Sequence, residues 1–136
     1  MSDNYFNYKP GLAAVGQYQM SGIPFATSSI SVPAAINTTS PIVVNFPQVT
    51  KFVTVQNVAG DGLRVGFSAL GVTGSENGGK NYYFTLTTGS VYTGEFRVSK
   101  IFLMGTTSAV TASVIAGLTG IPTGSIQNNW TGSIGV

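Results

Sequence analysis

The chain has 136 residues, enough for one domain, and it contains no histidine, no cysteine and only four acidic residues, Asp3, Asp61, Glu76 and Glu95. Because proton transfer, covalent catalysis and metal binding usually depend on His, Cys or clustered carboxylates, we expect no catalytic residue, no cofactor, no metal site and no enzyme activity. The six Lys and Arg residues are spread along the sequence, whereas direct binding to nucleic acid requires clustered cations.

Helix formers are scarce and β-branched, aromatic and glycine residues are abundant, which predicts an all-β chain. Residues 1–16 lack a clear strand pattern, and we expect an N-terminal arm that embraces an adjacent subunit. The first strand is predicted at residues 17–20, continuing loosely through 23–25, and the second at residues 28–32. Residues 40–46 follow, where three consecutive aliphatic side chains predict burial on both faces or at an interface.

Two segments alternate clearly between apolar and polar residues. The pattern over residues 46–56 predicts that Val53 and Val55 face the core. Residues 63–68 form the most regular strand, with odd-numbered side chains predicted to point inward and even-numbered ones, including Arg64, outward.

The next segments combine a glycine-rich stretch with two strands. Residues 71–80 predict a flexible surface loop, and residues 82–86 a strand. One long strand is then expected at residues 94–104. Its inward parity switches near Ser99, as happens at a bulge or where a strand changes sheets.

The last core strand is predicted at residues 110–116, with a turn at residues 117–122. About eight strand-like segments predict two packed antiparallel sheets in one β-sandwich domain, residues 17–122. Residues 123–136 form a polar, glycine-rich C-terminal tail, which either frays or docks on a neighbour.

One group of charged side chains is predicted to lie close together on the strands. Glu95 and Arg97 share one face of a strand, close enough to pair with each other, with Lys100 or with Arg64. The pattern indicates either a solvated sheet face or a charged strip at a subunit contact, and neither is catalytic.

Two further patterns favour a turn and a loop over ligand binding. Asp61 and Glu76 could share a calcium ion in principle, but Asp61 between two glycines is better explained by a turn at residues 60–62. The glycines of residues 71–79 lack the Gly-Lys-Ser/Thr ending of a phosphate-binding loop.

The aromatic residues are mostly expected in the core or at interfaces. Tyr82 and Tyr83 are nevertheless candidates for stacking on a sugar, because adjacent strand residues point to opposite faces and one of the two rings is then exposed. Trp130 is a third stacking candidate. Two Asn-x-Ser/Thr patterns, at residues 37–39 and 129–131, matter only where the chain meets a glycosylating system. We discount both, because the N-terminus lacks the pattern of a secretory signal.

Only 7% of the residues are charged, far below the roughly 25% of typical soluble domains. Near-neutral surfaces associate, because little repulsion opposes contact between apolar patches. We therefore expect much of the surface to be covered by partners in an oligomer or assembly. The sequence contains no run of about 18 apolar residues, the length needed to span a bilayer. We expect the protein to be intracellular when it is made.

The order of four sequence blocks resembles the small single jelly-roll capsid proteins of large icosahedral DNA viruses, a group that includes penton proteins. The blocks are residues 46–55, 63–67, 98–103 and 116–121. The resemblance implies a sandwich of two four-stranded sheets, found in the virion, with five copies closing a fivefold vertex beside major and minor capsid proteins. It implies no catalytic residue. The lack of a long receptor-binding insertion favours a plain vertex plug.

Two alternatives use the same strands. A minor capsid or decoration protein would assemble as a trimer or as a shell-bound monomer. A carbohydrate-binding β-sandwich would use Tyr82, Tyr83 and Trp130 as stacking residues, which a glycan array would detect.

Overall fold

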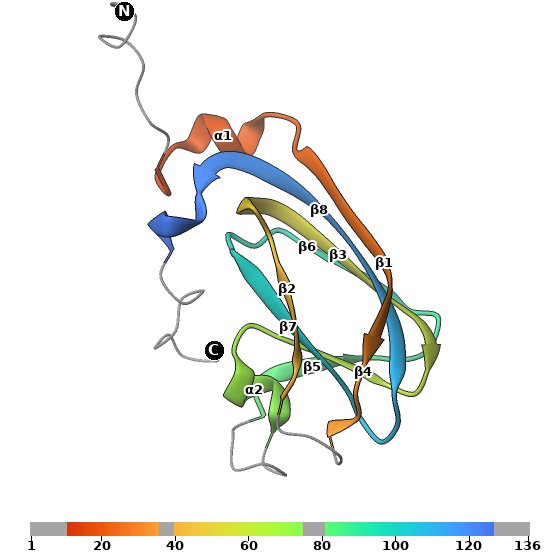
Figure 1. Cartoon of the computed structure of the whole chain (residues 1–136). Helices are drawn as coiled ribbons and strands as arrows, with labels where there is room; N and C mark the ends of the chain where they lie inside the picture. The colour runs from red at the N-terminus through yellow and green to blue at the C-terminus, as the bar shows by residue number, and fades with distance from the viewer. Residues whose placement is uncertain (1–10, 36–39, 75–80, 127–136) are drawn as a thin grey trace, which may run out of the picture.

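The protein is an all-β sandwich of two four-stranded antiparallel sheets (Figure 1). The structure is a computed structural model and describes residues 11–35, 40–74 and 81–126. One sheet has the order β1-β8-β3-β6 and the other β2-β7-β4-β5. The strands are β1 (Ile23–Val32), β2 (Ile42–Asn45), β3 (Gln48–Gly60), β4 (Leu63–Gly66), β5 (Tyr83–Leu86), β6 (Val91–Gly94), β7 (Lys100–Gly105) and β8 (Val110–Pro122).

The strand pairing is nested in the sequence. Strand β1 pairs with β8, β2 with β7, β3 with β6 and β4 with β5. The β3–β8 and β4–β7 ladders then join these four pairs into two sheets. This is the arrangement of a jelly roll, so the predicted single sandwich of about eight antiparallel strands is confirmed.

The main core fills the space between the two sheets. Val53 and Val55 face it from β3, as predicted, and pack among the side chains of Leu63, Val65 and Val114. The two-residue period of an extended strand explains this agreement, since side chains alternate between core and outer face. The run in β2 follows the same rule, because Val44 is buried while Val43 is exposed. Burial on both faces within the chain is therefore wrong, and the predicted alternative, burial at an interface, stays a prediction.

The predicted single strand at residues 94–104 is wrong, because two strands in different sheets occupy this segment. The change of sheet explains the switch of inward parity that was predicted near Ser99. Strand β6 ends at Gly94 in one sheet and β7 begins at Lys100 in the other. The buried hydroxyl of Thr50 fixes the crossing, because it donates to the Phe96 carbonyl and accepts from the Val98 amide at 3.1 Å. The chain therefore changes sheets between β6 and β7.

The predicted turn at residues 117–122 is also wrong, since β8 continues to Pro122. Gly117 lies opposite Phe52 in the β3–β8 ladder. A Cβ atom at Gly117 would lie 2.3 Å from Cε1 of Phe52, so the absent side chain makes room for the ring. The glycine marks a close side-chain approach and no reversal of the chain.

The predicted strand at residues 17–20 is replaced by a short helix, α1 (Val15–Gln19). Gln17 holds it against the sandwich, because its Oε1 accepts from the Gly120 amide at 3.2 Å. Strand β1 then runs unbroken through the two segments predicted separately, with a register shift between Thr27 and Ile30. Ser29 has a φ of 56° at this bulge.

Both ends of the described chain lie at one end of the sandwich. Leu12, Tyr18 and Ile126 pack with Val49 and Ile121 in a small hydrophobic cluster, which we call the terminal cluster. The 3-10 helix η4 (Thr123–Ser125) leads into it. The predicted boundaries after residues 16 and 122 stay predictions, and residues 1–10 and 127–136 lie outside the described residues.

The opposite end of the sandwich carries hairpin turns. The β3–β4, β5–β6 and β7–β8 turns are tied together there: the Thr88 hydroxyl donates to the Gly60 carbonyl, and the Thr106 amide to the Gly62 carbonyl at 2.9 Å. The predicted turn at residues 60–62 is confirmed. One end of the sandwich thus carries a hydrophobic cluster and the other carries hydrogen-bonded hairpin turns.

A second short helix, α2 (Ala69–Thr73), packs on the outer face of the β2-β7-β4-β5 sheet. Val72 lies there against Ala35, Phe102 and Met104. The loop predicted at residues 71–80 therefore begins as helix, and residues 75–80 lie outside the described residues.

Candidate functional site

Arg64 points to the outer face of its sheet, as predicted, but α2 covers it there, so the expected exposure to solvent is wrong. It is 5% exposed, and its Nη1 donates to the carbonyl oxygens of Thr73 at 3.0 Å and Val72 at 3.5 Å. The guanidinium carbon lies 4.5 Å from the ring centroid of Tyr83. Alternation alone predicted exposure, because nothing in residues 69–73 indicated a helix covering this face. Arg64 satisfies the C-terminal carbonyls of α2, a structural role.

The structure separates Arg64 from the other residues of the predicted charged strip. Arg64 lies beneath α2, while Arg97 donates to the Leu12 carbonyl at 3.2 Å near the terminal cluster. Lys100 places Nζ 5.9 Å from the ring centroid of Phe102, and Glu95 is exposed in the crossing between the sheets. These cations hold separate parts of the fold.

Asp61 lies in the exposed turn between β3 and β4, as the turn interpretation predicts. Its Oδ2 accepts from the Thr107 hydroxyl and its Oδ1 from the Gly62 amide at 2.8 Å. These two hydrogen bonds, the one from Thr107 first, lower the pKa of the Asp61 carboxyl. Glu76, the other candidate calcium ligand, lies outside the described residues. Across residues 11–35, 40–74 and 81–126, no group of three His, Cys, Asp or Glu side chains could hold a metal ion.

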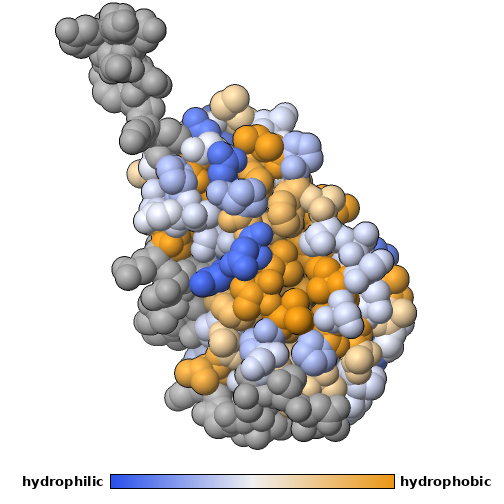
Figure 2. Space-filling view, viewed as in Figure 1, coloured by the Kyte–Doolittle hydropathy of each residue, from blue (hydrophilic) through white to orange (hydrophobic). Residues whose placement is uncertain are grey.

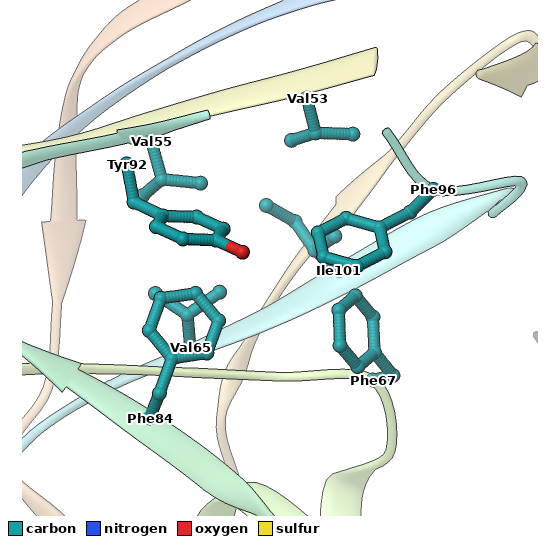
Figure 3. A pocket seen from close by; sticks show the side chains of 8 residues that line it. All are labelled: Val53, Val55, Val65, Phe67, Phe84, Tyr92, Phe96 and Ile101. Carbon is teal, nitrogen blue, oxygen red and sulfur yellow. The ribbon is translucent and has the colours of Figure 1, made fainter. Parts of the chain in front are cut away.

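Aromatic rings close one side of the sandwich, between the edge strands β5 and β6 (Figure 3). Phe84 and Tyr92 have ring centroids 4.8 Å apart, and Phe67 and Phe96 meet edge to face at 5.1 Å. With four aliphatic neighbours they line an apolar cavity of about 10 Å³. This volume holds about one water molecule at most, so the cluster is packing and not a ligand pocket.

The sugar-stacking candidates do not converge in the described part of the chain. Tyr82 is 39% exposed, but Tyr83 is half-buried against the Arg64 guanidinium. Trp130 and the glycosylation patterns at residues 37–39 and 129–131 lie outside the described residues.

An open groove of about 360 Å³ runs beside the terminal cluster. Asn45, Phe46, Ser99, Lys100 and η4 line it. Lys100 is the one charged residue among those that line the groove, and its Nζ lies near the Phe102 ring. The groove therefore presents mostly hydroxyl and backbone groups. This chemistry favours no particular ligand.

Charge and exposed apolar surface are distributed unusually over the strands. Every charged residue within a described strand lies on a central one: Lys51 on β3, Arg64 on β4 and Lys100 on β7. The four edge strands, β1, β2, β5 and β6, contain none. Figure 2 shows hydrophobic residues gathered over β2 and the space between it and β1. The sequence alone gives the low charge but not its distribution over the sheets, which depends on strand order.

The described helices are too short to cross a membrane. No protein-family model and no curated protein matches the chain. A comparison of structures finds a chain from a work entitled "Bacillus endospore appendages form a novel family of disulfide-linked pili". The two chains are 16% identical, with a TM-score of 0.39, and the match covers 74% of this chain and 92% of that one. A likeness at this level supports no statement about function.

Proposed function

We propose that the chain is a structural viral capsid protein, the penton that closes an icosahedral fivefold vertex as a homopentamer. The observation that carries the proposal is the nested pairing of eight strands into a jelly roll, an architecture used by viral capsid domains. In this role the chain is a non-enzymatic component of the virion, and its other partners are major and minor capsid proteins.

The surface composition also supports assembly. Only 7% of the residues are charged, and Val43 and Val91 are exposed on strands. Exposed apolar groups on a chain with so little charge favour association, because solubility as a separate monomer normally depends on charge. Neighbouring copies would cover this surface.

The two unlike ends of the sandwich suit a vertex protein. One end carries the terminal cluster and the other the hairpin turns. A rigid body with different ends presents one surface to the shell and another to the solvent.

Native mass spectrometry of the purified protein at low salt, over a range of concentrations, tests the proposal. A pentamer is the expected result. A trimer would instead favour a minor capsid or decoration protein. A monomer that binds sugars on a glycan array would favour a carbohydrate-binding module, since lectins also use jelly rolls and Tyr82 is exposed.

A further inference from the structure

We infer that the two open sides of the sandwich are the contact surfaces between copies of this chain, with the β1/β2 edge of one copy against the β5/β6 edge of the next. The β1/β2 edge comprises strands β1 and β2, and the β5/β6 edge comprises β5 and β6. The inference deepens the proposed function and rests on its premise that the chain assembles with itself.

The four strands belong to two opposite sides of the molecule. Phe25 of β1 and Phe46, next to β2, meet edge to face with centroids 5.1 Å apart, so β1 and β2 lie together on one side. The Phe84–Tyr92 contact places β5 and β6 together on the other. Each of these strands pairs with one neighbour within the described ranges. Both sides therefore present backbone groups on which a further strand could pair.

Edge strands in natural proteins are protected against such pairing by short length, Pro, bulges or charges, especially Lys. Here the edge strands carry the first three devices but no charge. Strand β1 has Pro24 and the bulge at Ser29, while β2, β5 and β6 have only their short length. The strand lysines and arginine lie on central strands instead, where they do not protect an edge. This distribution is expected of edges that are covered in the assembled state.

Both edges carry partly exposed apolar side chains. At the β1/β2 edge, Phe25, Ile30 and Ile42 are half-buried and Val43 is 40% exposed. Figure 2 shows hydrophobic surface over β2 and between it and β1. At the β5/β6 edge, Val91 is 56% and Tyr92 40% exposed.

A second copy of the chain is the partner that fits these edges. A charged partner surface would bury its charges without counter-charges on these strands, which is costly. The two edges also complement one another, because Ile42 and Val43 of one are β-branched and Tyr92 of the other is aromatic, and such side chains pair well across strands. Contact between two different surfaces on opposite sides is heterologous, and heterologous contacts generate rings when the rotation closes.

Lysine substitutions at matched positions test the inference. Val43→Lys and Val91→Lys place a charge on β2 and β6. Val58→Lys and Ile115→Lys are their controls, because Val58 (45% exposed) and Ile115 (53%) lie on the central strands β3 and β8. We expect each edge variant to raise the concentration of half-assembly at least about tenfold. The controls should change it less than about threefold. Native mass spectrometry gives these values, and far-UV circular dichroism reports whether each variant folds.

Cysteine cross-linking tests the pairing of edges without disturbing the fold. The chain has no cysteine, so Val43→Cys and Val91→Cys each carry a single thiol. With a short bis-maleimide, a mixture of the two variants should form cross-linked dimers, and each variant alone should form few. Efficient cross-linking of Val43→Cys with itself would overturn the heterologous arrangement. A Val58→Cys and Ile115→Cys mixture that reacts equally well would overturn the contact at the edges.

The outcomes separate this inference from the proposed function. A wild-type pentamer whose assembly is unchanged by both edge lysines would overturn the inference alone. An oligomer of another size that dissociates with the edge lysines would support the inference and overturn the pentamer. A wild-type monomer at every concentration would overturn both.

Discussion

The guanidinium group of Arg64 contacts backbone carbonyls and an aromatic ring. Replacing it with Met keeps much of the side-chain volume but removes the donor to the Val72 and Thr73 carbonyls and the contact with Tyr83. We expect R64M to lower the free energy of unfolding by about 2 kcal/mol, since a hydrogen bond from a charged group and a cation–π contact are both lost. Urea unfolding monitored by circular dichroism measures the change.

Arg97 provides the matched control, because it is exposed and donates to the backbone carbonyl of Leu12. R97M should cost less than about 1 kcal/mol. Equal losses for the two variants would contradict the structural role assigned to Arg64.

Asp61 makes stability sensitive to acid. Hydrogen bonds from Thr107 and Gly62 lower its pKa in the folded state below the ordinary value of 3.8. A lowered folded-state pKa contributes stability that is present above the unfolded value and is lost as the pH falls through the folded value. We therefore expect D61N to flatten the decline in the free energy of unfolding between about pH 5 and pH 2, measured by urea titration.

Thr107 supplies the companion variant for that experiment. T107V removes the main cause of the lowered pKa while leaving the carboxyl in place, so its acid dependence should lie between those of wild type and D61N. An acid decline that is the same in all three proteins would show that Asp61 does not contribute.

At the scale of elements, the terminal cluster ties the N-terminal segment to the sandwich. A truncation that removes residues 1–10 leaves every described contact in place. Removing residues 1–16 also deletes Leu12 from the cluster and the carbonyl that accepts from Arg97. We expect the longer truncation to be less stable than the shorter by about 1–2 kcal/mol, from lost apolar burial and one hydrogen bond.

Thermal unfolding of both truncated proteins measures this difference. Leu12→Ala in the full chain is the conservative control and should reproduce part of the loss. Indistinguishable truncations would mean that the packing of residues 11–16 adds nothing to stability.

The elements also show how far local pattern predicts this fold. Alternation located the core side chains of β3 and β4, such as Val53 and Val65, because the period of two is a local property. It failed at Gly117, since the ring of Phe52 that lies over this glycine comes from a distant strand. It failed at Arg64 for the same kind of reason, because the covering helix is fixed by tertiary packing. The edges followed only from strand order, which no local pattern contains.

At the scale of the whole molecule, an assembly through uncharged edges should be insensitive to ionic strength. Screening weakens contacts between charges and leaves apolar contacts intact. We expect the concentration of half-assembly to change less than about threefold between roughly 0.05 M and 0.5 M NaCl. Sedimentation velocity at several salt concentrations measures it. Dissociation at the higher salt would point to ionic contacts and away from the edges.

Strands β3 and β8 each run 13 residues from the terminal cluster to the hairpin turns, a span of about 40 Å in an extended chain. The β5–β6 turn at the far end includes Gly89, and no heavy atom within 4 Å would meet a Cβ atom there. A foreign epitope inserted beside Gly89 would therefore project away from the terminal cluster, where both described chain ends lie. Each ring would then carry one epitope per subunit, which makes the molecule a carrier for multivalent display.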